Sequence, residues 1–419
     1  MTERHDVMIA GAGPAGLATA LFILRRRPEL AGRIVALEKR RHPRDKVCAG
    51  GLIPKTMLAL DALGLRLGVP SVEVRTGIAR TAIGEVRIDR GDVLCTIVRR
   101  AEFDSWLARE AVTAGLRIIE ECTVRAVHQD AASVTLETDR GSFHAQVLVG
   151  ADGSGSRVRR AIFGDGKATI GRAIMTDVPL DSVPACCAGI DSGGSDFRDG
   201  RYRFDFTCVG RGIPGYAWSF PCLIDGRPHL NVGIYDQYPR HGDAPIRVGK
   251  PPLVSVLAEV FPSTAADHSE ASGAHALKSF PIRWFDAADR FSSGRVILAG
   301  DAAGVDPLMG EGISCAFEHG RLAADAAIAF LAGDREAFAR YDHALHRGPV
   351  GRKLRRLAFA ARHFYGPHHR AYFRLALMSR RAQDIGIDWY NGAEHADELS
   401  VPRALGRWAR AVLFGSTVR

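Results

Sequence analysis

The sequence predicts an α/β fold in which a parallel-sheet unit is interrupted by a mostly β segment and followed by a helical region. Apolar runs typical of buried parallel strands occur at Val7–Ala10, Gln146–Gly150 and Arg295–Ala299. The first and the last of these runs lead into segments with helical spacing of apolar residues. Between about residues 167 and 278 this alternation is lost, and many aromatic residues, prolines and glycines indicate strands instead.

Length and composition are those of a globular protein with more than one domain. The chain has 419 residues, of which 46% are hydrophobic and 25% are charged. No run approaches the ~20 apolar residues of a membrane span, and Met1–Asp6 is polar, so we expect a cytoplasmic protein without a signal peptide. The eight cysteines form no C-x-x-C pair, which argues against a zinc site and for a reducing compartment.

A glycine-rich turn follows the first predicted strand. Gly11, Gly13 and Gly16 have G-x-G-x-x-G spacing. The first glycine permits a tight turn, the second lets the backbone approach a pyrophosphate, and the third lets the next helix pack closely. The helix expected over Leu17–Arg27 would point its free N–H groups at the phosphates. This stretch therefore predicts a Rossmann-like dinucleotide site.

The second predicted strand, Arg33–Leu37, ends in an acidic residue. Glu38 stands where a carboxylate can accept a hydrogen bond from a ribose hydroxyl, which favours FAD or NAD over NADP. An accidental turn is the alternative in a chain with 45 glycines, but strand, helix and carboxylate all have the required spacing. The residues assigned to this turn and strand end are Gly11, Gly13, Pro14, Ala15, Gly16, Glu38 and Lys39.

The remaining elements divide the chain into three regions. We expect helices over Pro54–Leu63, Arg100–Ala114 and Gly312–Leu331, and strands within Val72–Ile97, Arg117–Glu137, Tyr202–Val209 and Leu230–Tyr235. The strands of Val72–Ile97 would form a separate sheet with turns at Gly77, Gly84 and Gly91. The expected regions are a nucleotide domain of residues 1–70, 98–166 and 279–342, a β-rich substrate domain of 71–97 and 167–278, and a helical region of 343–419.

Three further motifs occur in order along the chain. Arg100-x-x-Phe103-Asp104 opens a predicted helix, Gly150-Ala151-Asp152-Gly153 follows a strand, and Gly300-Asp301-Ala302-Ala303 leads into Gly310-Glu311-Gly312-Ile313. Any one of them could be a simple turn. Together with the glycine-rich turn they resemble the FAD-binding signatures of the flavoprotein group that contains the aromatic hydroxylases and the geranylgeranyl reductases. The resemblance covers most of residues 1–330.

This resemblance implies FAD as the cofactor and a role for each matching residue. Glu38 would hold the adenosine ribose, Arg100 would reach the pyrophosphate region, and Asp301 would bond the ribityl chain. The helix after Gly312 would face the flavin N1 and C2 carbonyl with its positive end, where reduced flavin is negative. Glu311 is alternatively a residue that only stabilises the helix start. The implied cofactor residues are Arg100, Asp152, Gly153, Gly300, Asp301, Gly310, Glu311, Gly312 and Ile313.

Two motifs resemble those of the geranylgeranyl reductase branch. The loop Lys46–Leu52 is similar to that family's cysteine-bearing loop, and Gly215–Pro221 matches its Tyr-x-Trp-x-Phe-Pro motif on the substrate side of the flavin. A flavin halogenase would show Trp-x-Trp-x-Ile-Pro instead. These reductases saturate isolated double bonds of prenyl chains. The implied substrate contacts are Gly50, Gly51, Tyr216, Trp218, Phe220 and Pro221.

The implied reaction is hydride delivery from flavin N5 to one alkene carbon and protonation of the other. Cys48 is the candidate proton donor or flavin-tuning residue, with simple packing as the alternative. A flavin monooxygenase that hydroxylates or epoxidises a metabolite shares the FAD motifs and is the first rival. A non-catalytic prenyl-binding carrier is the second, although it predicts the loss of cofactor motifs that are intact here.

The net charge of +9 comes from one segment. Residues 343–383 contain ten Lys or Arg and no Asp or Glu, so the rest of the chain is near neutral and a nucleic-acid partner is not expected. This segment is either an interfacial helix attracted to anionic lipids or a helix that packs its apolar face on the protein. It also suits docking of an acidic electron carrier of the ferredoxin type, with NAD(P)H as the other electron donor.

Overall fold

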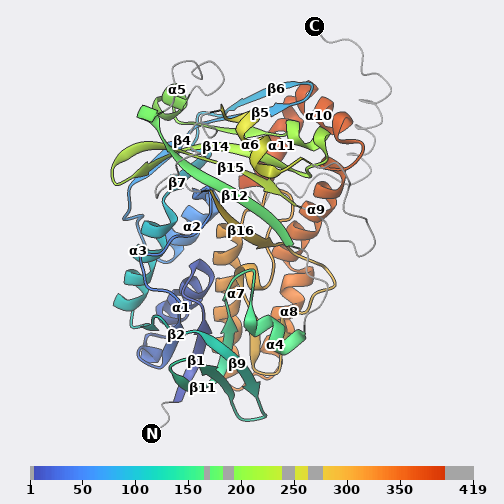
Figure 1. Cartoon of the computed structure of the whole chain (residues 1–419). Coiled ribbons are helices and arrows are strands. Elements are labelled where there is room, and N and C mark those ends of the chain that lie inside the picture. The colour runs from blue at the N-terminus through green and yellow to red at the C-terminus, as the bar shows by residue number, and fades with distance from the viewer. Residues whose placement is uncertain (1–3, 165–169, 183–192, 238–250, 263–276, 392–419) are drawn as a thin grey trace.

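Two large β-sheets divide the protein into a nucleotide-binding half, drawn at the bottom of Figure 1, and a β-rich half, drawn at the top. The computed structural model describes residues 4–164, 170–182, 193–237, 251–262 and 277–391. Helices of the C-terminal region run along one side of both halves (Figure 1). This arrangement confirms the predicted α/β class with an interrupting β segment.

The lower sheet has eight strands and a parallel centre. Strand β1 (Arg4–Ala10) lies between β2 (Ile34–Leu37) and β11 (Gly141–Gly150), and it is parallel to both. The strands are apolar because helices cover both faces, as in other parallel sheets. The other strands are β8 (Arg117–Ile119), β9 (Val124–Gln129), β10 (Val134–Thr138), β17 (Ser292–Ser293) and β18 (Val296–Leu298).

Helices α1 (Pro14–Arg26) and α7 (Ile313–Leu331) pack against each other beside this sheet. A Cβ added at Gly320 would lie 2.9 Å from the Cβ of Ala18, so glycine permits their close approach. The positive ends of both helices consequently reach the same edge of the sheet. The remaining helices of this half are α2 (Pro54–Ala62), α3 (Arg100–Thr113), α4 (Arg157–Phe163) and α8 (Ala337–Arg347).

The upper sheet has seven strands in the order β16-β12-β15-β14-β13-β5-β6. One face is apolar against α6 (Leu253–Val260), and the other faces the nucleotide-binding half and the C-terminal helices. A short helix, α5 (Gly193–Arg198), packs near the sheet edge. The strands are β5 (Thr76–Thr81), β6 (Gly84–Asp89), β12 (Ile170–Pro179), β13 (Arg201–Asp205), β14 (Gly215–Ile224), β15 (Arg227–Asp236) and β16 (Lys278–Arg283).

The strands expected within Val72–Ile97 do not form one separate sheet. Strands β4 (Ser71–Val74) and β7 (Cys95–Val98) join β3 (Gly51–Leu52) in a three-stranded sheet, whereas β5 and β6 belong to the upper sheet. Gly77 lies inside β5, so the turn predicted there is wrong. A Cβ at Gly77 would lie 2.9 Å from the Tyr202 ring, so the absence of a side chain at this position leaves room for the ring.

Two other boundaries differ from the expectation. The strand expected over Tyr202–Val209 ends at Asp205, because the Asp205 carboxylate accepts hydrogen bonds from the backbone N–H and the hydroxyl of Thr207 and turns the chain. Strand β16 runs to Arg283 and pairs with β12, so the substrate sheet extends beyond the boundary expected at residue 278.

The C-terminal helices bury some of their apolar residues against the rest of the protein. Leu354 and Leu357 of α9 (Pro349–Phe364) and Phe373 of α10 (His369–Met378) are buried, while Phe359 and Met378 are exposed. This supports the alternative in which the basic segment packs its apolar face on the protein. The region continues through α11 (Arg380–Asn391), and the part of 343–419 beyond residue 391 lies outside the described residues. None of the described helices is long and apolar enough to cross a membrane.

Candidate functional site

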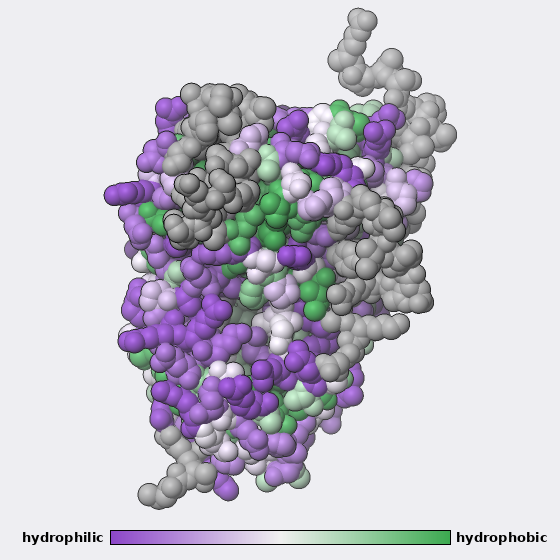
Figure 2. Space-filling view, viewed as in Figure 1, coloured by the Kyte–Doolittle hydropathy of each residue, from purple (hydrophilic) through white to green (hydrophobic). Residues whose placement is uncertain are grey.

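A cavity of about 570 Å³ joins the two halves of the molecule. It is lined by the glycine-rich turn, the loop of residues 44–51, the start of α7 and the inner face of the upper sheet. On the face shown in Figure 2, hydrophilic residues dominate the lower half and apolar residues gather on the upper half. The cavity lining has a polar end with charged side chains and the starts of α1 and α7, and an apolar end with aromatic side chains of the upper sheet.

Of the three glycines in the glycine-rich turn, Gly11 and Gly13 line the cavity, and Gly11 and Gly16 are required by close backbone contacts. Gly11 has a φ of +100°, and a Cβ there would lie 2.4 Å from the Ala151 carbonyl oxygen. A Cβ on Gly16 would lie 2.0 Å from the Gly11 oxygen, and Gly16 does not line the cavity. Gly13 has an ordinary φ of −88°, and its nearest neighbour would be Arg44 at 3.4 Å. Its missing side chain leaves space in the cavity where a phosphate fits.

Glu38 is held rigidly at the end of β2. Its two carboxylate oxygens accept hydrogen bonds from the backbone N–H groups of Ala12 at 3.0 Å and Arg40 at 3.1 Å. The side chain is buried, and both Glu38 and Lys39 line the cavity. The carboxylate thus braces the glycine-rich turn and stands at the predicted position for a ribose.

Two arginines and a carboxylate form a buried charge cluster beside this turn. Arg100 makes two hydrogen bonds to Asp104, at 2.8 and 3.0 Å. Arg44, which sequence reasoning missed, has a side chain only 12% exposed and lies 3.3 Å from Asp104. The Nε of Arg44 is buried without a hydrogen-bond partner among the described residues. Both arginines line the cavity next to Gly13, which suits a pyrophosphate. Arg44 follows the second strand and belongs to none of the motifs that indicated the cofactor site, so no local pattern of residues pointed to its role.

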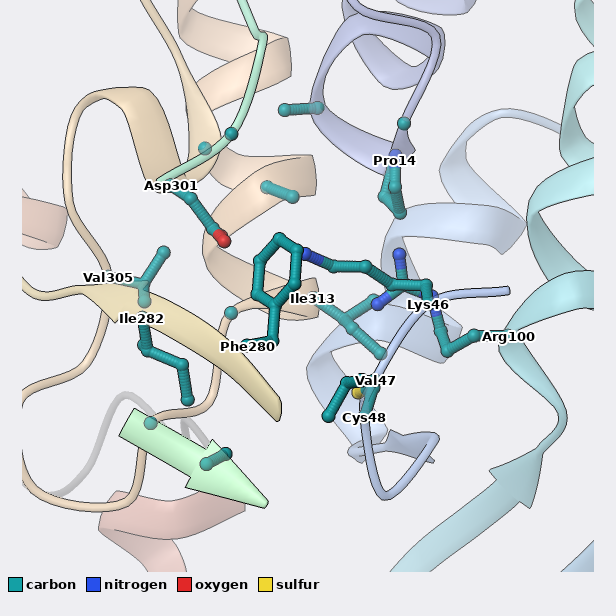
Figure 3. A pocket seen from close by; sticks show the side chains of 18 of the residues that line it. Pro14, Lys46, Val47, Cys48, Arg100, Phe280, Ile282, Asp301, Val305 and Ile313 are labelled. Atoms are coloured by element: carbon teal, nitrogen blue, oxygen red, sulfur yellow. The ribbon is translucent and has the colours of Figure 1, made fainter. Parts of the chain in front are cut away.

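The Asp-Gly and Gly-Asp motifs meet at the cavity from opposite sides. Asp152 accepts hydrogen bonds from Ser156 and from the backbone N–H of Arg157 at 2.7 Å, so its carboxylate holds the first turn of α4. Asp301 accepts a hydrogen bond from Ser154 at 2.9 Å and points into the cavity (Figure 3). Gly153 and Gly300 lie beside them in the cavity wall.

The start of α7 forms the floor of the cavity. Gly312 is the N-cap, and the Glu311 carboxylate accepts hydrogen bonds from the backbone N–H and the hydroxyl of Ser314. Glu311 therefore caps the first turn of the helix. Gly310 and Ile313 complete this wall, where the free N–H groups of the helix face the cavity.

Lys46, which belongs to the cysteine-bearing loop but was not assigned to the site from the sequence, also lines the cavity. Its ammonium nitrogen lies 3.1 Å from the centre of the Phe280 ring of β16 (Figure 3). Burial lowers the pKa of Lys46 to about 8, although the charge of Asp301 opposes this shift. Lys46 and Phe280 thus connect the loop of the lower half to the upper sheet by a cation–π contact.

We expect the affinity for FAD to fall as pH rises from about 7 to about 9. Lys46 is an ammonium below its pKa of about 8 and a neutral amine above it, so the attraction for the dianionic pyrophosphate weakens with rising pH. Each unit by which the ligand raises this pKa corresponds to about a tenfold change in affinity. Titration of FAD fluorescence at several pH values measures the slope. Lys46→Met should bind FAD more weakly and lose most of the slope; an unchanged slope would contradict the assignment.

Cys48 lies in the cavity wall between the two halves. Its sulfur accepts a hydrogen bond from the backbone N–H of Gly50 at 3.3 Å. Gly50 has a φ of +76°, and a Cβ there would lie 1.9 Å from the Val98 oxygen, so the conformation of the loop requires glycine at this position. Gly50 does not line the cavity. Gly51 does line it, beside Cys95.

The apolar end of the cavity is an aromatic wall on β14. Tyr216, Trp218 and Phe220 alternate along the strand and face the cavity, whereas Pro221 does not line it. The Tyr216 hydroxyl donates a hydrogen bond to the Met309 carbonyl, and the Trp218 indole N–H donates one to Asn231 at 2.8 Å. These bonds satisfy the polar atoms of both rings and leave their apolar surfaces toward the cavity.

Two further aromatic residues of this wall were missed by sequence reasoning. Phe204 of β13 lies opposite Trp218 in the sheet, and Tyr390 of α11 lies 5.8 Å from Phe204 between ring centres. Both line the cavity. Tyr390 is almost 170 positions away from the Tyr-x-Trp-x-Phe-Pro motif, so only the tertiary fold brings it there.

Comparison with known proteins identifies the class of protein. Residues 4–193 match the family described as FAD binding domain. The space beside Gly13, the unpaired Nε of Arg44 and the start of α7 fit a dinucleotide with a pyrophosphate. The chain is therefore an FAD-dependent oxidoreductase, which argues against the non-catalytic carrier.

The relatives confirm the resemblance to the geranylgeranyl reductase group. The chain is 29% identical to the menaquinone reductase of Mycobacterium tuberculosis over 77% of this chain and 76% of that protein. It is 28% identical to the geranylgeranyl diphosphate reductase of Rhodobacter capsulatus, over 80% and 78%. A Streptomyces rimosus tetracycline monooxygenase is 27% identical over 75% of this chain and 61% of that protein.

The fold is shared with a solved structure across nearly the whole chain. A geranylgeranyl bacteriochlorophyll reductase-like protein from Thermoplasma acidophilum superimposes with a TM-score of 0.66. The two are 18% identical, and the match covers 98% of this chain and 96% of that protein. At this identity the likeness shows the architecture, and the reaction has to be argued from the site.

Proposed function

We propose that this protein reduces carbon–carbon double bonds of a prenyl chain, or of a similar apolar molecule, with bound FAD. The observation that carries the proposal is the continuity of one cavity from the phosphate-binding end at Gly13 to the aromatic wall at Trp218. A nucleotide bound at the polar end would extend toward the aromatic end, where an apolar chain finds few polar partners. Two of the relatives act, by their names, on menaquinone and geranylgeranyl diphosphate.

Reduced FAD would supply the hydride for one alkene carbon. We assign the proton for the other carbon to the Cys48 thiol, which borders the cavity where the loop and the aromatic wall meet. The substrate contacts proposed from the sequence are retained for Gly51, Tyr216, Trp218 and Phe220, with Phe204 and Tyr390 added. Burial raises the pKa of Tyr216, so its hydroxyl stays protonated and keeps its bond to Met309. Gly50 and Pro221 would act only by shaping the loop and strand.

The same proposal assigns roles within the cofactor site and the domains. Glu38, Arg100, Asp301 and the start of α7 would contact FAD, while Gly16 and Asp152 would position the turns that do so. The substrate domain would comprise 71–97 and 167–283, since β16 belongs to its sheet. Electrons would come from NAD(P)H or a ferredoxin-type carrier. The cations of 343–383 are proposed as the carrier's docking surface or as a contact to anionic lipids.

Anaerobic reduction of the FAD-loaded protein, followed by mixing with a geranylgeranyl compound, tests the reaction. We expect reoxidation of the flavin together with saturation of the chain, detected by mass spectrometry as an increase of two hydrogens per bond. The rival monooxygenase predicts instead a transient hydroperoxide absorbance when the reduced protein meets oxygen. That species, combined with no anaerobic turnover, would overturn the proposal.

A further inference from the structure

A second, smaller cavity lies behind the loop that carries Cys48. Its volume is about 30 Å³, which is room for about two water molecules. The side chains of Asp45 and Lys278 line it and are 57% and 38% exposed, so this cavity reaches the surface. These two side chains form an ion pair at 2.9 Å.

The cysteine loop separates the two cavities. Lys46, Cys48 and Ala49 line both of them, as do Asp45, Arg100 and Lys278, so the loop is part of the partition between two adjoining cavities. The Cys48 backbone N–H donates a hydrogen bond to the Met175 sulfur at 3.2 Å, which anchors the partition to β12. Cys48 therefore borders the substrate cavity and the second cavity.

A polar network lines the second cavity on the upper sheet. Asp177 of β12 and Asn231 of β15 are direct cross-strand partners, and the Asn231 amide donates a hydrogen bond to the Asp177 carboxylate at 2.7 Å. Asn231 is itself oriented by the Trp218 indole N–H. Asp177 is two residues from Met175 on the same strand face, so its carboxylate stands close to the partition. The arrangement is suited to hold water, because water needs several polar partners.

We propose that the second cavity is the proton entrance for Cys48, with Asp177 as its relay residue. The inference rests on the proposed reduction. When the alkene carbon takes its proton, the S–H bond of Cys48 breaks and a C–H bond forms, which leaves a thiolate. The Asp177 carboxylate then takes up a proton from solvent at Asp45 and Lys278 and passes it to a water in the second cavity, while that water gives one of its own protons to the sulfur. No electrons move in this step.

Comparing the single-turnover rate with the steady-state rate distinguishes a defect in the reprotonation of Cys48 from a defect in the reduction of the double bond. Asp177→Asn keeps the shape of the side chain but removes its proton exchange, so the first turnover should keep its rate while steady-state turnover falls by roughly tenfold. Asp225→Asn is the matched control, since Asp225 is exposed at the β14–β15 turn and lies outside both cavities. Equal effects on both phases, or no effect on either, would overturn the relay. Absence of turnover in the wild-type protein would instead overturn the proposed reduction.

A second measurement does not depend on turnover. Hydrogen peroxide is about the size of water and oxidises exposed thiols, so it should reach Cys48 through the second cavity when FAD fills the first. Alkylation of the remaining thiol after denaturation, followed by peptide mass spectrometry, gives the oxidation rate. Ala101→Leu, which adds three carbons to the wall of the second cavity, should slow that rate severalfold without changing FAD occupancy. An unchanged oxidation rate in a folded variant would contradict the entrance.

Discussion

Replacing Gly13 by alanine should strongly weaken the binding of FAD while leaving the fold intact. A Cβ at Gly13 would contact the protein only at Arg44, at 3.4 Å, and the backbone there is in a region that any residue adopts. The methyl group would instead occupy the space that the pyrophosphate needs. We expect affinity to fall by roughly 100-fold, about 2.7 kcal/mol, in a fluorescence titration of the apoprotein with FAD.

The neighbouring glycine provides the contrasting control. Gly16→Ala would place a Cβ 2.0 Å from the Gly11 oxygen, so that variant should lose stability and show a lower melting temperature even without FAD. Gly13→Ala should keep the circular dichroism spectrum and melting temperature of the wild-type apoprotein. Purified Gly13→Ala protein that remains yellow with full occupancy would show that the cofactor lies elsewhere.

Replacing Cys48 by alanine should lower the single-turnover rate of double-bond reduction by roughly 100-fold to 10,000-fold, which is the range for a lost general acid. FAD affinity should stay within a factor of about two, because Arg100 keeps its bidentate pairing with Asp104 and the loop keeps its glycines. Stopped-flow oxidation of the reduced flavin by substrate gives the rate, and equilibrium titration gives the affinity.

Cys48→Ser distinguishes proton donation from packing. The hydroxyl has a similar size but is a much weaker acid than the thiol, so the serine variant should be slow yet faster than the alanine variant. Equal rates for the wild-type, serine and alanine proteins would assign Cys48 to packing alone. A loss of FAD affinity in the alanine variant would point to a cofactor-holding role for the sulfur.

The elements nearest the nucleotide site were predictable because their signals are local. Strand β1 and the glycine-rich turn depend on neighbouring residues, and Glu38 follows directly from the end of β2, whereas α1 begins at Pro14, three residues before the predicted Leu17. Features that depend on residues distant in the sequence were predicted wrongly. Gly77 was taken for a turn, although it is a strand residue that makes room for a ring from β13.

The sequence by itself determined the α/β class, the glycine-rich turn and the Tyr-x-Trp-x-Phe-Pro motif, since each follows from spacing within a short segment. The tertiary structure alone decided which distant side chains meet. Phe280 of β16 reaches Lys46, Tyr390 of α11 reaches the aromatic wall, and Asp177 of β12 stands behind Cys48. Such meetings depend on sheet register and helix packing across the whole chain, which no local pattern of residues contains.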